Sequence, residues 1–266
     1  MTAPGRLRGP PRPAGPPFQV LMDFDGTFVE PNVAIELVAE FAQDGARVAK
    51  EVDLDLHAGR ITLREAWARE VALLPMGRMD EMARYTVDNI PLRSGAQELC
   101  RFLLRRNIPL AIVSGGLDFY ITPLLRREGL DVPIFSDSVD RGGEGGTALL
   151  RHPYGHPTCR LCGICKAQVV RTHSLQGPPV VFVGDGSTDR YAAETADVVF
   201  ARHRLLTYCR EQGIPHVPFE DLHPVREHLE SWFEGRTSLP LRRSKGLASS
   251  SCPISQELAQ ARPSGS

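Results

Sequence analysis

Acidic and small polar residues follow three short apolar runs of the chain, at the points where strands of a parallel sheet would end. In open α/β sheets, ligands bind beyond the carboxyl ends of the strands, so these residues are expected to meet at one edge. Taken singly, each group is also compatible with an ordinary solvated turn. The groups are Asp23 and Asp25 after Phe18–Met22, Ser114 and Gly115 after Ile108–Val113, and Asp185 and Asp189 after Val180–Val183.

Carboxylates gathered at one edge need a compensating charge, because unpaired buried carboxylates are costly. A bound divalent cation would supply this positive charge, and hard oxygen ligands favour Mg²⁺. Ser114, Lys166 and free backbone N–H groups could then hold a phosphoryl group beside the metal. One aspartate could attack phosphorus, and a second could act as general acid and then base. The pattern therefore predicts phosphoryl chemistry through an aspartyl-phosphate.

Alternating strand and helix patterns predict the elements that position these residues. The alternation is typical of a parallel sheet covered by helices on both faces. A stretch from 31 to 90 interrupts it with helical patterns only, and we interpret it as an inserted cap. Capping-box patterns at Thr62 with Glu65 and at Ser94 with Gln97 predict two helix starts.

Composition and charge predict where the domain boundaries lie. Hydrophobic residues make up 42% of the 266 residues and charged residues 24%, as in a globular protein. The proline-rich segment 1–17 and the basic, serine-rich segment 236–266 are predicted to be disordered tails. The core is then 18–30 together with 91–235, and the cap is 31–90.

The charge distribution and the hydropathy pattern narrow the range of partners. The net charge is −1, and the two basic tails leave the middle of the chain acidic, which disfavours nucleic-acid binding. No apolar run is long enough to span a membrane, and no secretory signal is evident, so we expect a cytoplasmic protein without a membrane partner. A monomer and a homodimer both stay open.

The four motifs, in this order and spacing, resemble those of the haloacid dehalogenase superfamily of phosphatases. The resemblance implies a three-layer α/β/α, Rossmann-like core with an inserted helical cap, and one Mg²⁺ per site. It implies that Asp23 is the nucleophile and a metal ligand, and that Asp25 is the acid/base and a ligand through its carbonyl. It further implies that Ser114, Gly115 and Lys166 bind the phosphoryl group, that Asp185 binds the metal, and that Asp189 supports the metal site.

Within the superfamily, residues 18–235 resemble the phosphatases of methionine salvage, which act on 2-hydroxy-3-keto-5-methylthiopentenyl-1-phosphate. The segments that carry this likeness are 114–125, 162–166 and 200–212. Phosphoserine phosphatases are similar in motifs and cap position, but they usually carry a glutamate where this chain has Asn32. Another small-metabolite phosphatase or a phosphotransferase is a further alternative. A catalytically silent binding module is disfavoured, because every motif residue is present.

A cysteine-rich run precedes Lys166. The residue types in this run, together with His152 or His156 upstream, are those of a structural zinc site, although neighbouring Cys-x-x-Cys pairs share one cysteine. The alternative is a set of reduced, partly buried thiols. The zinc hypothesis assigns the ligands to His156, Cys159, Cys162 and Cys165.

Overall fold

A seven-stranded sheet forms the centre of the protein, in a computed structural model that describes residues 15–140, 149–242 and 246–260. The strands lie in the order β4–β3–β2–β1–β5–β6–β7. All neighbouring pairs are parallel except β3 and β4, which form an antiparallel hairpin. The strands are β1 (Gln19–Met22), β2 (Leu110–Leu117), β3 (Ile134–Asp140), β4 (Leu149–Arg151), β5 (Val180–Gly184), β6 (Val198–Ala201) and β7 (Val217–Pro218).

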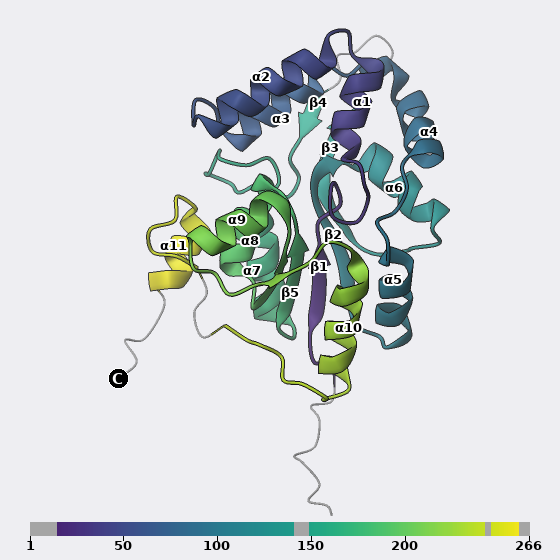
Figure 1. Cartoon of the computed structure of the whole chain (residues 1–266). Helices are drawn as coiled ribbons and strands as arrows, with labels where there is room; N and C mark the ends of the chain where they lie inside the picture. The colour runs from purple at the N-terminus through teal and green to yellow at the C-terminus, as the bar shows by residue number, and fades with distance from the viewer. Residues whose placement is uncertain (1–14, 141–148, 243–245, 261–266) are drawn as a thin grey trace, which may run out of the picture.

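Helices cover both faces of this sheet, with α5 (Ala96–Arg105) and α10 (Leu222–Phe233) on one side and α7 (Lys166–Gln176), α8 (Arg190–Thr195) and α9 (His203–Glu211) on the other (Figure 1). The three-layer α/β fold predicted from the sequence is therefore confirmed. Within the described ranges, no helix is both long enough and apolar enough to cross a membrane. The remaining helical elements are α1 (Val33–Phe41), α2 (Gly45–His57), α3 (Leu63–Val71), η1 (Met76–Arg78), α4 (Met79–Asn89), α6 (Asp118–Arg127), η2 (Ser187–Asp189) and α11 (Pro253–Gln260).

Side chains of the central strands alternate between two hydrophobic clusters. In β1, Val20 and Met22 face the cluster that includes α5 and α10, whereas Leu21 faces the cluster beneath α7, α8 and α9. Successive side chains of a strand point to opposite faces, so a strand buried on both faces is expected to be largely apolar. This is why the sequences of β1 and β5 lack the polar alternation of a half-exposed strand.

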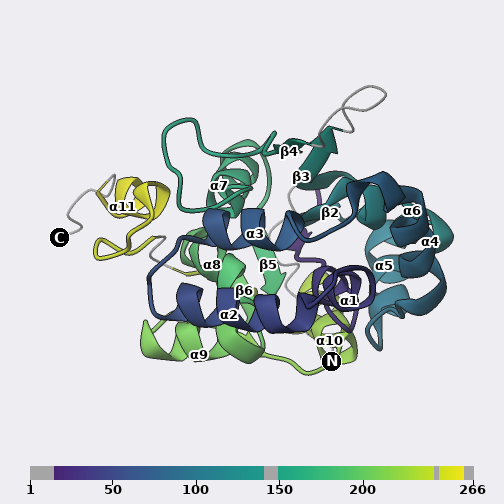
Figure 2. The same cartoon turned by 90° about the horizontal axis from the view of Figure 1, so that it is seen from above.

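The chain between β1 and β2 is helical, as predicted for residues 31–90. Leu37 of α1 and Met82 of α4 are buried in the cluster that also contains α5 and α10. Seen from above, α2 and α3 lie side by side across the top of the sheet (Figure 2). Asp53 of α2 forms a two-point ion pair with Arg204 of α9, with N···O distances of 2.8 and 3.1 Å. The helical segment is thus tied to the part of the protein that carries the sheet.

Helix starts follow the sequence prediction at one position and depart from it at another. The capping box of Thr62 and Glu65 is present at α3. At α5 the N-cap is Gly95, with a φ of +84°, and the predicted Ser94–Gln97 box is absent. The Ser94 hydroxyl instead lies 3.2 Å from Nε2 of His223, because α10 packs against this helix end.

The C-terminal segment also differs from its prediction as a disordered tail. Helix α11 lies in that segment, and its Ile254 is buried together with Cys252 against Cys165 and Ala167. Apolar burial of this kind stabilises an element that composition alone marks as disordered. Of the predicted N-terminal tail, residues 1–14 lie outside the described residues, as does the glycine-rich part of the β3–β4 connection.

Candidate active site

The sequence motifs converge at the carboxyl ends of β1, β2 and β5, as their placement after apolar runs predicted. Asp23 directly follows β1, and Asp185 directly follows β5. Lys166 is the first residue of α7, and Asp189 is the last residue of η2. Ser114 and Gly115 lie within β2, which is longer than expected and changes register after Ser114.

Lys166 connects two of the aspartates. Its Nζ atom lies 2.5 Å from Oδ1 of Asp23 and 2.7 Å from Oδ1 of Asp189, and all three side chains are buried. Burial alone would lower the pKa of Lys166, but the carboxylates of Asp189 and Asp23 outweigh it and raise that pKa. The lysine is therefore a fixed positive charge between two carboxylates.

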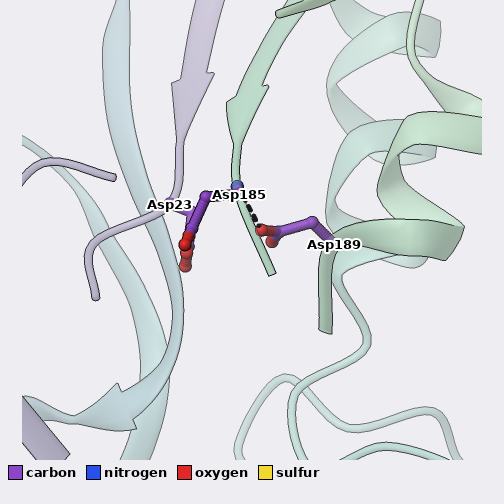
Figure 3. Close-up of side chains that lie close together, drawn as sticks. All are labelled: Asp23, Asp185 and Asp189. Carbon is purple, nitrogen blue, oxygen red and sulfur yellow. Dashed lines mark hydrogen bonds between the residues drawn. The ribbon is translucent and has the colours of Figure 1, made fainter. Parts of the chain in front are cut away.

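Three carboxylates converge on one point (Figure 3). One oxygen from each of Asp23, Asp185 and Asp189 lies within 4.8 Å of the other two. Asp189 is held in place because its Oδ2 accepts hydrogen bonds from the backbone N–H groups of Asp185 and Gly186, at 3.0 and 2.9 Å. Asp185 in turn accepts a hydrogen bond of 2.9 Å from the Thr27 hydroxyl.

The charge of this group fits a divalent cation. Burial raises the pKa of Asp185 to about 6, with the nearby Asp189 adding to the rise. Burial and the charge of Asp189 also raise the pKa of Asp23, and Lys166 opposes the rise. Carboxylates that destabilise one another are relieved by a bound cation. Oxygen donors of this kind suit Mg²⁺.

Asp25 lies apart from this trio and has its own set of partners. Its Oδ1 accepts from the backbone N–H of Val33 at 2.9 Å, and its Oδ2 accepts from the Tyr120 hydroxyl at 3.1 Å and the Ser114 hydroxyl at 3.4 Å. Burial nevertheless raises the pKa of Asp25. The contact with Tyr120 was not anticipated, because α6 carries this residue from a separate part of the chain.

Two glycines leave room for these carboxylates. A Cβ atom on Gly26 would lie 2.5 Å from Oδ2 of Asp185, and one on Gly116 would lie 2.6 Å from Oδ2 of Asp25. Both distances are far below van der Waals contact. Gly26 also has a φ of +78°, a conformation that other residues rarely adopt. The sequence motif Asp-x-Asp-Gly thus has a steric cause as well as a chemical one.

Arg93 holds the loop that follows β1 and was not identified from the sequence. Its guanidinium donates to the carbonyl oxygen of Gly26 at 2.6 Å, to that of Thr27 at 2.9 Å and to a carboxylate oxygen of Glu30 at 2.6 Å. Arg202 donates to the same Gly26 oxygen at 3.1 Å. Both arginines are buried, so the position of this loop depends on them.

A cavity of about 360 Å³ opens above the aspartates. Its floor includes Asp23, Asp25, Ser114, Gly115 and Lys166. Its opposite wall comes from α1, α2 and α3 and is mostly apolar, with one acidic residue, Glu70. The apolar residues of that wall are Ala34, Ile35, Leu56, Leu63, Ala66 and Trp67.

The predicted zinc site receives no support from the structure. Within the described residues, only Asp23, Asp185 and Asp189 form a group of three or more candidate ligands with all atoms within 4.8 Å. Nδ1 of His156 instead accepts a hydrogen bond of 3.0 Å from the backbone N–H of Cys159. Burial raises the pKa of Cys162 to about 12 and that of Cys165 to about 11, which favours neutral thiols.

Comparison with known proteins defines the class to which this fold and site belong. Residues 20–194 match the family model of haloacid dehalogenase-like hydrolases, and the chain belongs to this family. The predicted superfamily and the expected class of enzyme, a phosphatase, are thereby confirmed.

Relatives with named activities show a similarity to a particular kind of phosphatase. The chain is 32% identical over 216 residues to a 2-hydroxy-3-keto-5-methylthiopentenyl-1-phosphate phosphatase of Bacillus cereus, and 30% identical over 216 residues to one of Bacillus mycoides. Each match covers 81% of this chain and 97% of the relative. The similarity therefore covers most of this chain and nearly the whole length of each relative.

Solved structures share the fold at low sequence identity. A phosphoserine phosphatase from T. onnurineus matches with a TM-score of 0.60 and 16% identity, over 84% of this chain and 98% of that one. A phosphoserine phosphohydrolase-like protein from Francisella tularensis matches with a TM-score of 0.61 and 17% identity, over 79% and 98%. These likenesses concern the fold alone.

Proposed function

We propose that this protein hydrolyses 2-hydroxy-3-keto-5-methylthiopentenyl-1-phosphate, the substrate named for its Bacillus relatives. The observation that carries the proposal is the apolar wall opposite the aspartates, to which Leu56, Leu63 and Trp67 contribute. A methylthio tail would gain about 0.8 kcal/mol for each methylene-sized group that this wall removes from water. The phosphate would then face the polar floor of the same cavity.

Asp23 is the proposed nucleophile. Its Oδ attacks phosphorus as the bond from phosphorus to the ester oxygen breaks, which gives an aspartyl-phosphate. The positive charge of Lys166, 2.5 Å away, favours the ionised form that attacks. A Mg²⁺ ion held by Asp23, Asp185 and the Asp25 carbonyl, with Asp189 in support, would neutralise charge on the phosphoryl oxygens. Ser114, Gly115 and Lys166 are proposed to bind the phosphoryl group.

Asp25 is the proposed acid and base. Burial raises its pKa, so its carboxyl group can hold a proton for the ester oxygen that leaves phosphorus in the first step. The resulting carboxylate then removes a proton from water, whose oxygen attacks phosphorus and releases phosphate. Tyr120 and the Val33 N–H keep the carboxyl group oriented throughout.

Phosphoserine is the second candidate substrate. Asn32, which stands where phosphoserine phosphatases usually have glutamate, caps α1 by accepting from the Ile35 N–H at 3.1 Å. Glu70 favours this alternative, because it is a carboxylate in the cavity wall that could bind an ammonium group. A phosphotransferase would share the aspartyl-phosphate step and differ only in the acceptor.

Phosphate release with Mg²⁺ tests the proposal, with the methylthiopentenyl phosphate and L-phosphoserine compared at equal concentrations. We expect a higher kcat/KM for the first. Leu56→Ser should raise its KM about fivefold, since a lost apolar contact costs on the order of 1 kcal/mol. Leu54→Ser is the matched control, because Leu54 lies on the same helix but is 56% exposed. A preference for phosphoserine would overturn the substrate assignment.

A further inference from the structure

The last described segment of the chain, residues 246–260, packs against two helices that begin at the candidate active site. Helix α7 begins at Lys166, and α8 directly follows Asp189. Figure 1 shows α11, in yellow, beside both of these helices, and α11 contacts each of them. The segment lies outside residues 20–194, which match the hydrolase family model. An element outside that model is thus docked onto helices that carry residues of the site.

The apolar contacts of this segment fall on the two chain neighbours of Lys166. Cys252 and Ile254 are buried in one cluster with Cys165 and Ala167, the residues directly before and after the lysine. Side chains in such a cluster pack closely and leave the backbone that carries them few alternative positions. The first turn of α7, where Lys166 lies, is therefore held by the C-terminal segment.

The polar contacts of the same segment fall on α8. Glu194 has a buried carboxylate, which accepts hydrogen bonds from the Ser250 hydroxyl at 2.5 Å and from the Tyr208 hydroxyl. The hydroxyl oxygens of Tyr191 and Ser251 lie 2.6 Å apart. A buried carboxylate that loses a hydrogen-bond partner is destabilised, so Ser250 ties the segment firmly to α8.

The two helices place a pair of opposite charges in the site. Nζ of Lys166 lies 2.7 Å from Oδ1 of Asp189. Movement of α7 relative to α8 would change this distance, and with it the position of the lysine against a bound phosphoryl group. Because residues 246–260 contact both helices, they restrain that movement.

We propose that residues 246–260 form a C-terminal clamp that fixes the Lys166–Asp189 pair, with Ile254 and Ser250 as positioning residues for phosphoryl binding. Ile254 acts through the residues that flank Lys166, and Ser250 acts through α8. Among the described residues that line the substrate cavity, neither is present, so neither is expected to touch the substrate. This inference rests on the phosphoryl-binding role proposed for Lys166. It applies to any phosphate ester, since all of them share the phosphoryl group.

Ile254→Ala in the full chain tests the clamp, because the cavity that it leaves loosens the contact with the first turn of α7. Inorganic phosphate, a competitive inhibitor that lacks the rest of the substrate, reports on the phosphoryl site alone. A small displacement of a positioning group is costly, so we expect the inhibition constant of phosphate to rise about tenfold. The kcat/KM for p-nitrophenyl phosphate should fall by a similar factor. Ile254→Val keeps most of the side chain and should restore both constants to within about threefold of the wild type.

Leu229→Ala is the matched control. Leu229 is as buried as Ile254, but it lies on α10 in the cluster on the other face of the sheet. The control should lower the Tm by a comparable amount and leave the inhibition constant of phosphate unchanged, at a temperature where every variant is folded.

Ser250→Ala is a second test of the clamp, since it removes the hydrogen bond to Glu194 and little apolar contact. It should raise the inhibition constant of phosphate about threefold. A lowered Tm with an unchanged inhibition constant, in both Ile254→Ala and Ser250→Ala, would overturn the clamp and leave the segment a purely structural role.

Lys166→Gln distinguishes failure of the clamp from failure of the proposed function. If Lys166→Gln raises the inhibition constant of phosphate and Ile254→Ala does not, the clamp is overturned and the proposed function stands. If Lys166→Gln is folded and leaves the constant unchanged, the phosphoryl-binding role proposed for Lys166 is itself overturned.

Discussion

Nη2 of Arg93 donates a hydrogen bond of 2.6 Å to the carbonyl oxygen of Gly26, 67 residues earlier in the chain. The same guanidinium holds the Thr27 carbonyl, and the Thr27 hydroxyl in turn donates to Asp185. Arg93 therefore acts on the carboxylate trio through the loop and touches none of its members. It is a positioning residue for the proposed metal site.

Arg93→Lys should weaken Mg²⁺ binding, because an ammonium group cannot reproduce the forked contacts of a guanidinium. Loss of an outer partner of this kind typically costs 10- to 100-fold in metal affinity, so the half-saturating Mg²⁺ concentration should rise about tenfold. The half-saturating concentration is measured by titrating Mg²⁺ and recording activity in one series and the Tm in another. Arg101→Lys, on the exposed face of α5, is the control. A lower Tm with unchanged Mg²⁺ dependence would reduce Arg93 to a structural role.

Asp23→Asn should abolish turnover, since an amide cannot attack phosphorus as a carboxylate does. We expect kcat to fall roughly 10⁴-fold or more. The Asn side chain keeps an oxygen that can accept from Lys166, so the fold should survive, and thermal unfolding checks this. Asp88→Asn, exposed on α4, controls for the loss of a charge. Activity near that of the wild type would remove Asp23 as the nucleophile.

Asp25→Asn should slow both chemical steps, because the leaving oxygen and the attacking water each need a proton transfer. General acid–base groups contribute about 10²–10⁴-fold, and kcat should fall by that amount. An ester with a leaving group that needs no protonation, such as p-nitrophenyl phosphate, should be less affected in the first step. Single-turnover kinetics separate the two steps. If the rate is unaffected for the methylthiopentenyl phosphate, another residue must supply the proton.

Removal of divalent ions should stop catalysis, and added Mg²⁺ should restore it. Mg²⁺ at about 100 times its Kd should also stabilise the fold by about 2.7 kcal/mol, through binding to the native state alone. The shift in Tm measures this independently of turnover. Asp185→Asn should lose most of the shift, because it removes one of the three converging carboxylates. Full activity in the presence of a chelator would contradict the proposed Mg²⁺ site.

Glu70 should make stability depend on pH. Burial, followed by the charge of Asp53, raises its pKa to about 7 from an ordinary value of 4.5. The folded state thus holds this proton more tightly than the unfolded state does. Its contribution to stability is complete below pH 4.5 and is lost as the pH rises through about 7.

Glu70→Gln tests this dependence, because a neutral side chain cannot lose the proton. The decline in Tm between pH 5 and 8 should be shallower in this variant than in the wild type. Glu98→Gln, exposed on α5, should follow the wild-type curve. Parallel curves for all three proteins would show that Glu70 titrates normally.

The sequence was sufficient to predict the sheet and most of the residues that meet in the floor of the candidate site. Apolar runs identify strands that are buried on both faces, and Asp23, Ser114 and Asp185 follow or end such runs. Parallel strands then bring these residues to one edge without further information. The helix that begins at Lys166 was also predictable from its pattern.

Contacts between distant segments were not predictable in this way. Arg93 binds the Gly26 carbonyl, and Tyr120 donates to Asp25, only after the chain has folded. Neither the arginine nor the tyrosine carries a local signal of such a role. The cysteine spacing around Cys162 left two interpretations open, a zinc site and reduced thiols, and the structure gives no support to the first. Spacing shows which thiols are near one another in the chain, but it does not show how far apart their sulfur atoms lie.

The glycines beside the carboxylates have a consequence for how this protein can evolve. The positions that a Cβ would occupy at Gly26 and Gly116 lie within 2.6 Å of carboxylate oxygens of Asp185 and Asp25. A saturation library scored for growth or turnover would therefore record these positions as nearly as intolerant as the aspartates themselves. Even the methyl group of an alanine at either position would displace a carboxylate that the proposed chemistry needs. The absence of a side chain at these glycines is therefore as much a requirement of the proposed site as the aspartates are.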